Sequence, residues 1–203
     1  MRKTVKYLLF IFAFLSLSAC GKSDKDASEI KQNTELNIKT YPIKKTGQTK
    51  SYDENGTEVN DGSLKDDAYY TIGKSVSYTR DDSKEIVTDH FTELEWQDDK
   101  NVSSIKKNWL GAQTYCTTLG LDNGEWRLPT RRELVSLSNY GQKDPAIDSI
   151  FKNIVSASYW SSTPYADPAA DIDDAWFVDF NEHGQFKKNK KNEYHICCVR
   201  SEK

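Results

Sequence analysis

The chain has 203 residues and a formal net charge of −3 at pH 7. This length suits one ordinary domain with a tether, and the slightly acidic overall charge does not indicate a protein that binds nucleic acid. Five Trp, eleven Tyr and eight Phe, against a single Met at the start, favour a rigid, exported, β-rich domain over a helical bundle.

The first twenty residues are typical of a secretory signal that ends in a bacterial lipobox. Three cations precede an apolar stretch at residues 7–15, and Ser18 and Ala19 then lead to Cys20. This order predicts cleavage before Cys20 and attachment of acyl chains, palmitate among them, to that cysteine. The apolar stretch is shorter than the about 20 residues that a membrane-spanning helix needs, so the alternative is a signal peptide that is cut elsewhere.

We therefore expect a lipoprotein signal peptide at residues 1–19, an acylated tether at residues 20–40 and one domain at residues 41–203. The tether is polar and charged without a sustained period, which is typical of a flexible linker. Gly21 and Lys22 follow the cysteine, so the aspartate that in some bacteria retains a lipoprotein at the inner membrane is absent. The predicted location is the bacterial cell envelope, with the acyl chains in the lipid bilayer of the outer membrane.

Short strands and turns are predicted from residue 46 to residue 96. Asn55-Gly56 favours a tight hairpin, and Asn60-Asp61-Gly62 signals a second turn. Apolar and polar residues alternate, as in half-buried strands, over residues 75–79, 85–89 and 92–96.

Two helices and three further strands are predicted in the second half of the chain. The first helix covers residues 108–119, where one face collects Trp109, Ala112, Cys116 and Leu119. The second helix starts at Thr130, which forms a capping box with Glu133. The further strands are predicted at residues 159–162, 176–180 and 194–200. The predicted fold class is α+β, with a mainly antiparallel sheet and two helices packed on it.

Three cysteines remain for the exported domain once Cys20 carries lipid. An odd number in an oxidising compartment predicts one disulfide and one thiol left over. Neighbouring cysteines rarely bond each other, so Cys116 is expected to pair with Cys197 or Cys198, and the residues alone leave that choice open. No ligand spacing indicates a structural metal site.

Positive residues offer two candidate anion sites. A charged hairpin tip is predicted after Phe186, where sulfated or phosphorylated polymers would be attracted to Lys187, Lys188, Lys190 and Lys191. The alternative is that this tip is only solvated. Arg127 precedes the second helix, where it is expected either to bind an anion or to pair with a buried acid and fix the loop.

Acidic residues offer a candidate calcium site, because calcium takes six or more oxygen ligands from a loop. The candidates are Asp167, Asp171, Asp173 and Asp174, with a second set in Asp53, Asn55 and Asp61. Neither set has EF-hand spacing. The alternative to calcium binding, for both sets, is that these residues only form turns and face solvent.

No catalytic motif is visible, and we do not expect an enzyme. Ser161-Ser162 lacks the GxSxG elbow, and the chain has no Walker motif, Rossmann glycine set or HExxH. No cofactor is expected, with calcium as the one candidate.

Several short motifs follow one another in a characteristic order: Thr46-Gly47-Gln48-Thr49, Tyr78-Thr79-Arg80-Asp81, Ile86-Val87-Thr88-Asp89, Leu94-Glu95-Trp96-Gln97, Tyr115-Cys116, Trp126-Arg127-Leu128-Pro129-Thr130, Tyr159-Trp160-Ser161-Ser162-Thr163, Ala175-Trp176-Phe177-Val178-Asp179-Phe180 and Cys198-Val199-Arg200. Over residues 41–201 this set resembles the Lcl C-terminal domain family. These are bacterial exported domains named after the tail domain of a collagen-like adhesin.

The resemblance implies a C-type-lectin-like fold, which formylglycine-generating enzymes share. It also implies a disulfide between Cys116 and Cys198, which leaves Cys197 unpaired, and binding of sulfated glycans. The collagen-like repeats of the adhesin are absent from this chain, so the resemblance does not imply a trimer.

The expected function is therefore a surface lipoprotein with a lectin-like binding module for extracellular polysaccharide or for adhesion. The predicted partners are the lipid bilayer and a sulfated or anionic polysaccharide, with no nucleic acid. Two alternatives remain: a thiol-dependent oxidoreductase related to formylglycine-generating enzymes, by analogy of fold alone, and a structural envelope protein without a soluble ligand.

Overall fold

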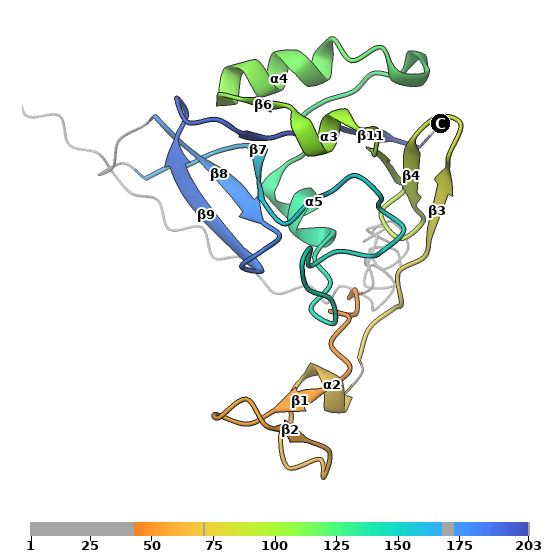
Figure 1. Ribbon diagram of the computed structural model, residues 1–203, viewed down its shortest axis with the longest axis vertical. Helices are drawn as coiled ribbons and strands as arrows, with labels where there is room; N and C mark the ends of the chain where they lie inside the picture. The colour runs from red at the N-terminus through yellow and green to blue at the C-terminus, as the bar shows by residue number, and fades with distance from the viewer. Residues whose placement is uncertain (1–42, 71, 168–172, 203) are drawn as a thin grey trace, which may run out of the picture. The chain divides into compact units, whose positions relative to one another are not determined.

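A computed structural model describes residues 43–70, 72–167 and 173–202 (Figure 1). All of them fall within one compact unit. The predicted signal peptide, the predicted lipidation site Cys20 and the predicted tether lie outside the described residues, as does Asp171.

The described strands form three sheets, and almost all of their pairs are antiparallel. A small hairpin pairs β1 (Ser51–Tyr52) with β2 (Glu58–Val59). A four-stranded sheet has the order β11-β5-β4-β3, formed by Val199–Ser201, Leu94–Gln97, Ile86–Asp89 and Tyr78–Asp81.

The largest sheet has five strands in the order β6-β10-β7-β8-β9. Its only parallel pair joins β10 to β7, through His195 and Tyr159. Its strands are Lys106–Lys107, Tyr194–His195, Ser158–Pro164, Asp174–Asp179 and Gly184–Asn189.

Helical segments in the described residues are short: α2 (Asp67–Tyr70), α3 (Asn101–Ser104), α4 (Trp109–Thr117), the 3-10 turn η1 (Leu121–Asn123) and α5 (Arg131–Ser136). The two predicted helices are α4 and α5. Asn108 caps α4 by accepting a hydrogen bond from the Gly111 N–H, and both bonds of the predicted capping box are present at α5. The expected α+β class with mostly antiparallel strands is confirmed.

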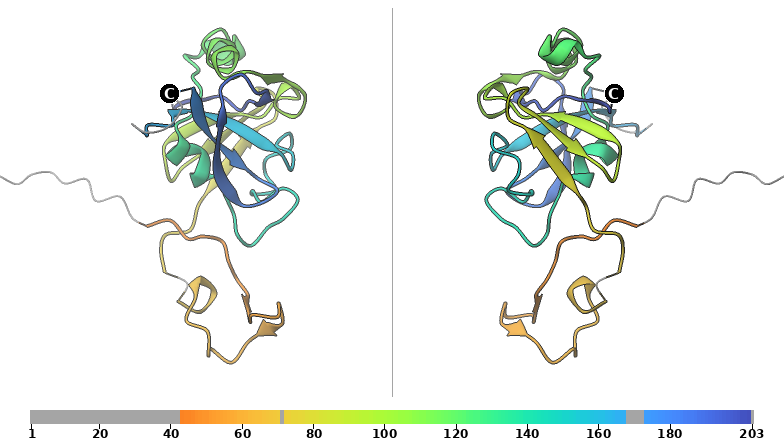
Figure 2. Two further views of the ribbon diagram at one scale, coloured as in Figure 1. Left: turned by 90° about the vertical axis from the view of Figure 1, so that its left-hand side faces the viewer. Right: turned by 90° about the vertical axis from the view of Figure 1, so that its right-hand side faces the viewer.

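Buried side chains form two clusters that occupy opposite faces of the five-stranded sheet. Side chains alternate along a strand, so Tyr159 and Val178 enter one cluster, the Tyr159 core, while Trp160 and Phe177 enter the other, the Trp160 core. Leu134 of α5 packs in the Tyr159 core. Helix α4, which Figure 2 shows end-on at the top of both views, lies against the Trp160 core.

The last strand of the chain is interrupted, so the prediction of one strand over residues 194–200 is wrong. β10 belongs to the five-stranded sheet and β11 to the four-stranded sheet. Between them the Cys198 N–H donates to the side-chain oxygen Oε1 of Gln97 (3.2 Å) instead of to a backbone carbonyl. Ile196 and Cys198 enter the Trp160 core, whereas Cys197 and Val199 enter the Tyr159 core.

The structure contains the disulfide Cys116–Cys198, which joins α4 to this crossing segment and is the pairing that the family resemblance implies. Cys197 is free and buried, and its side chain faces the other core. Because its side chain points away from Cys116, Cys197 does not compete with Cys198 for the disulfide bond.

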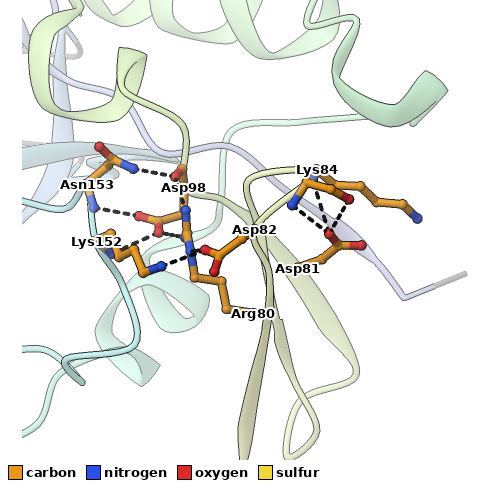
Figure 3. A network of polar contacts seen from close by, with 8 residues as sticks. Arg80, Asp81, Asp82, Lys84, Asp98, Lys152 and Asn153 are labelled. Carbon is orange, nitrogen blue, oxygen red and sulfur yellow. Dashed lines mark hydrogen bonds and ion pairs between the residues drawn. The ribbon is translucent and has the colours of Figure 1, made fainter.

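A second set of long-range contacts surrounds the buried carboxylate of Asp98 (Figure 3). Asp98 forms an ion pair with Arg80 of β3 and accepts hydrogen bonds from the backbone N–H groups of Lys152 and Asn153, both at 2.9 Å. Asp82 at the surface bridges Arg80 and the Lys152 ammonium at 2.6 and 2.7 Å. This network ties the four-stranded sheet to the loop that precedes β7.

We predict that replacing Cys116 and Cys198 together by alanine lowers the free energy of unfolding by about 4 kcal/mol in the chain-entropy treatment, because the bond spans 82 residues. The matched control Cys197→Ala removes one buried sulfur without opening a loop, and should cost on the order of 1 kcal/mol. Urea unfolding measures both. An equal loss in the two proteins would contradict the assigned role of the bond.

Asp98→Ala should lower the free energy of unfolding by about 3–5 kcal/mol. It removes the buried carboxylate opposite the Arg80 side chain, which is only 8 % exposed and keeps, among the described residues, only the exposed Asp82 as a carboxylate partner. The control is Asp82→Ala, which removes an exposed carboxylate from the same network and should unfold close to wild type. Chemical unfolding monitored by tryptophan fluorescence compares the two. If Asp82→Ala lowered the free energy of unfolding and Asp98→Ala did not, the roles assigned to the two carboxylates would be wrong.

Candidate functional site

The four lysines predicted to form a charged hairpin tip do not lie together at a tip. Lys187 and Lys188 belong to β9, and only Lys190 and Lys191 lie in the turn after it. The prediction is wrong for the first two because six residues of β9 pair with β8, and because the ring of Phe186 packs on Phe177. Alternation along the strand then sends Lys187 and Lys188 to opposite faces of the sheet.

On the Lys187 face, two cations and two aromatic rings follow one another. We call this set the cation–aromatic row: Arg131, Trp176, Tyr165 and Lys187. The Arg131 guanidinium lies 4.4 Å from the centre of the Trp176 ring, and the Lys187 ammonium lies 4.0 Å from the centre of the Tyr165 ring. The two rings meet edge to face, with 5.5 Å between their centres. Both cations are thus held on aromatic faces.

Local structure explains why these residues meet. The cap at Thr130 makes Arg131 the first residue of α5, and the Arg131 N–H donates to Thr163 Oγ1 of β7 (2.9 Å). Trp176 of β8 stands directly opposite Lys187 of β9. Tyr165 follows β7, where its N–H donates to the Asp174 carbonyl (3.0 Å). Four elements therefore converge on the row.

The two cations of the row differ in whether a nearby carboxylate neutralises them. The Lys187 ammonium lies 3.7 Å from the Asp174 carboxylate at the edge of the row. No carboxylate in the described part of the chain forms an ion pair with Arg131. Arg131 is only half-buried, so an anion from solution can still reach its positive charge.

Arg200 provides the contrast within the same fold. Its guanidinium also lies on an aromatic ring, 4.6 Å from the centre of Trp126. Carboxylates of Glu95 and Asp122 pair with it at 2.5 and 2.7 Å, and its side chain is only 4 % exposed. This second cation–aromatic pair is neutralised and buried, as expected for a structural contact.

Arg127 pairs with an acid, one of the two outcomes expected for it. Two hydrogen bonds reach the Glu133 carboxylate, at 2.8 and 2.7 Å. Burial acts to raise the pKa of Glu133, but the hydrogen bonds from Arg127 and from the Thr130 N–H outweigh it and lower that pKa. The same carboxylate closes the capping box, so Arg127 fixes the start of α5 and is already occupied.

A further cation is supported by an aromatic ring at the end of β9. The Lys190 ammonium lies 4.8 Å from the centre of the Trp109 ring, and the Trp109 indole N–H donates to the Ser161 carbonyl (2.8 Å). Two of the four predicted lysines, Lys187 and Lys190, thus have aromatic support, although Lys187 is exposed, as Lys188 and Lys191 are.

The predicted calcium ligands gather no metal cluster in the described residues. There, no group of three or more His, Cys, Asp or Glu side chains is arranged to hold a metal ion. Asp167 lies 3.3 Å from the Tyr165 hydroxyl, and Asp174 faces Lys187. The carboxylate of Asp53 in the second set accepts hydrogen bonds from the N–H groups of Asn55 and Thr57, as in an ordinary turn.

The three cysteines of the domain are all inaccessible to solvent. Cys116 and Cys198 form the disulfide, and the Cys197 thiol donates to the Gln97 carbonyl at 3.3 Å. Burial, with a smaller contribution from the charge of Asp99, raises the pKa of Cys197 well above its usual range. A thiolate at this position is strongly disfavoured.

The chain belongs to the Lcl C-terminal domain family. The model of that family matches residues 85–200, which is more than half of the chain. A comparison with the curated proteins finds no match. Within residues 43–70, 72–167 and 173–202, no helix combines the length and apolar character that crossing a bilayer requires.

Sequence reasoning missed the row as a unit. It noted Trp176 only as part of a strand and Lys187 only as part of a basic run. A usable signal was the alternation Asp174, Trp176 and Val178 along β8, which places the tryptophan on the α5 face. The partner across the strand depends on the β8–β9 register, which the sequence leaves open.

Proposed function

We propose that this chain is a lipoprotein of the bacterial cell envelope whose domain binds an anionic polysaccharide, with sulfated glycans as the first candidates. The observation that carries the proposal is the cation–aromatic row, above all the charge of Arg131 on the Trp176 ring, which no carboxylate of the described residues pairs. A polymer of this kind presents sulfate or carboxylate groups along an otherwise uncharged chain of sugar rings, which matches cations separated by aromatic rings.

The rings make the cations better ligands than free surface lysines are. A free Lys or Arg side chain loses up to about 2 kcal/mol of rotamer entropy when a ligand immobilises it. Arg131 and Lys187 already rest on rings, so part of their rotamer entropy is lost before a ligand binds. The row is therefore preorganised to bind anionic groups.

Family membership supports the same function. The family takes its name from the tail domain of a collagen-like adhesin, and adhesion through surface glycans fits a protein tethered to the envelope by Cys20. The proposal includes a C-type-lectin-like fold of the kind found in formylglycine-generating enzymes. In that fold the mixed sheets and the Cys116–Cys198 bond would serve as a rigid support for a binding surface.

The structure gives less support to the oxidoreductase alternative. Thiol chemistry of that type needs two reactive, exposed cysteines close together. Here Cys116 and Cys198 are bonded to each other, and Cys197 is buried with a raised pKa. The remaining alternative, a structural envelope protein, predicts that no soluble polysaccharide binds.

We predict that Arg131→Gln with Lys187→Gln weakens binding to heparin about tenfold at low salt, which corresponds to about 1.4 kcal/mol. The matched control changes their sequence neighbours, Arg132→Gln with Lys188→Gln. It removes the same net charge from exposed side chains and should change affinity less than about twofold.

Titration on a heparin surface at several salt concentrations measures both variants, and wild-type affinity should fall steeply with salt. Equal losses in the two double variants would show that only overall charge matters and would contradict a built site. Circular dichroism checks that both variants remain folded.

Membrane anchoring has a separate test. Cys20→Ala removes the atom that accepts the acyl chains, so the variant should accumulate as an unprocessed or soluble exported protein. Fractionation of cells that express the two forms, with metabolic labelling by a palmitate analogue, measures the change. A variant that is processed and partitions into membranes like wild type would refute the lipobox assignment.

A further inference from the structure

Residues 49–69 precede the segment that matches the family, and they line a separate hollow of about 400 Å³. Its walls come from the β1–β2 hairpin, from the turn after it and from α2. The lining residues that matter here are Thr49, Ser51, Val59, Asn60, Asp61 and Tyr69. This volume falls within the range of small-molecule sites, about 300–1,000 Å³.

The Asp66 carboxylate holds the walls of this hollow in place. It accepts hydrogen bonds from Ser51 Oγ of β1 and from Gln48 Nε2, each at 2.8 Å. It also accepts from the Tyr69 N–H at 3.2 Å, which joins the hairpin to α2. The shape of the hollow is therefore fixed by bonds between its walls.

Tyr69 is held although half of its surface is exposed. Gly62 has a φ of +71°, and a Cβ there would lie 2.9 Å from the Tyr69 ring, so the ring packs directly on the glycine backbone. The Lys65 ammonium lies 3.6 Å from the centre of the same ring. The Gly62 and Lys65 contacts thus hold the Tyr69 ring in place at the rim of the hollow.

The chemistry of the lining selects an uncharged, hydroxyl-rich ligand. Asp61 is the only charged residue among the described residues that line the hollow, and hydrogen bonds from Ser63 lower its pKa, so it is ionised at neutral pH and repels anions. Its free lone pairs accept from hydroxyl groups, the Asn60 amide both donates and accepts, and the Thr49 hydroxyl does the same. Lys65 covers one face of the Tyr69 ring, and the opposite face is apolar surface for C–H groups.

We propose that this hollow binds a neutral saccharide unit, with the C–H face of one sugar ring against Tyr69 and its hydroxyl groups at Asp61 and Asn60. The site is distinct from the cation–aromatic row in residues and in ligand charge. It does not depend on anionic polysaccharide binding at the row.

The test uses the full-length protein in a detergent without a sugar headgroup, because a glycosidic detergent would itself compete. Saturation-transfer NMR and calorimetry probe cellohexaose, maltohexaose, mannohexaose and xylohexaose up to about 10 mM, the weak end of measurable affinity. At least one of the four should bind. Tyr69→Ala and, as a variant that keeps the turn, Asp61→Asn should each weaken that binding about tenfold or more.

Tyr52→Ala is the matched control. Tyr52 is as exposed as Tyr69, but it follows Ser51 on the strand and does not line the hollow. This control, and the Arg131/Lys187 double variant, should leave the affinity for the neutral sugar within about twofold of wild type. Absence of binding by all four hexaoses, or binding that neither the Tyr69 nor the Asp61 substitution weakens, would overturn the proposal whatever the result with heparin.

Discussion

Between β10 and β11 the backbone sends successive side chains into opposite cores, and both large sheets depend on this short crossing. Ile196 and Cys198 fill the Trp160 core while Cys197 and Val199 fill the Tyr159 core. Gln97 supports the crossing from β5, since its side-chain oxygen accepts from the Cys198 N–H and its own N–H donates to the Cys198 carbonyl (2.9 Å). The disulfide then attaches α4 to the same point. Four adjacent residues thus connect two sheets, two cores and a helix.

The candidate binding row is a consequence of that arrangement. Trp176 belongs to β8 and Tyr165 directly follows β7, and these two strands share their buried faces with the crossing segment. Arg131 is supplied by α5, whose start is fixed by the bond between Arg127 and Glu133. The row therefore occupies a rigid support, and this rigidity is what distinguishes it from an exposed basic run. The row differs from the buried Arg200–Trp126 pair in its charge, because two carboxylates neutralise Arg200.

Local signals in the sequence predicted what local interactions determine. The capping box at Thr130 and the apolar face of residues 108–119 identified α5 and α4, and the alternation of apolar and polar residues identified β3, β4 and β5. The β9 strand was missed because its run of polar and basic residues lacks that alternation, and Phe186 is its single apolar anchor. The interruption after His195 depends on a glutamine about a hundred residues earlier in the chain, which no local pattern contains. The row and the hollow beside Tyr69 likewise join residues through register and turn geometry, so sequence spacing could not assemble them.

The central claim is that the cation–aromatic row binds an anionic polysaccharide, and chemical-shift mapping tests it most directly. The ¹⁵N-labelled protein is titrated with a heparin hexasaccharide and the indole and backbone N–H signals are followed. The account predicts the largest shifts at the Trp176 indole and at the amides of Arg131 and Lys187, with little change at the Trp126 indole under the neutralised Arg200. Shifts centred on other residues, or none at saturating hexasaccharide, would contradict it.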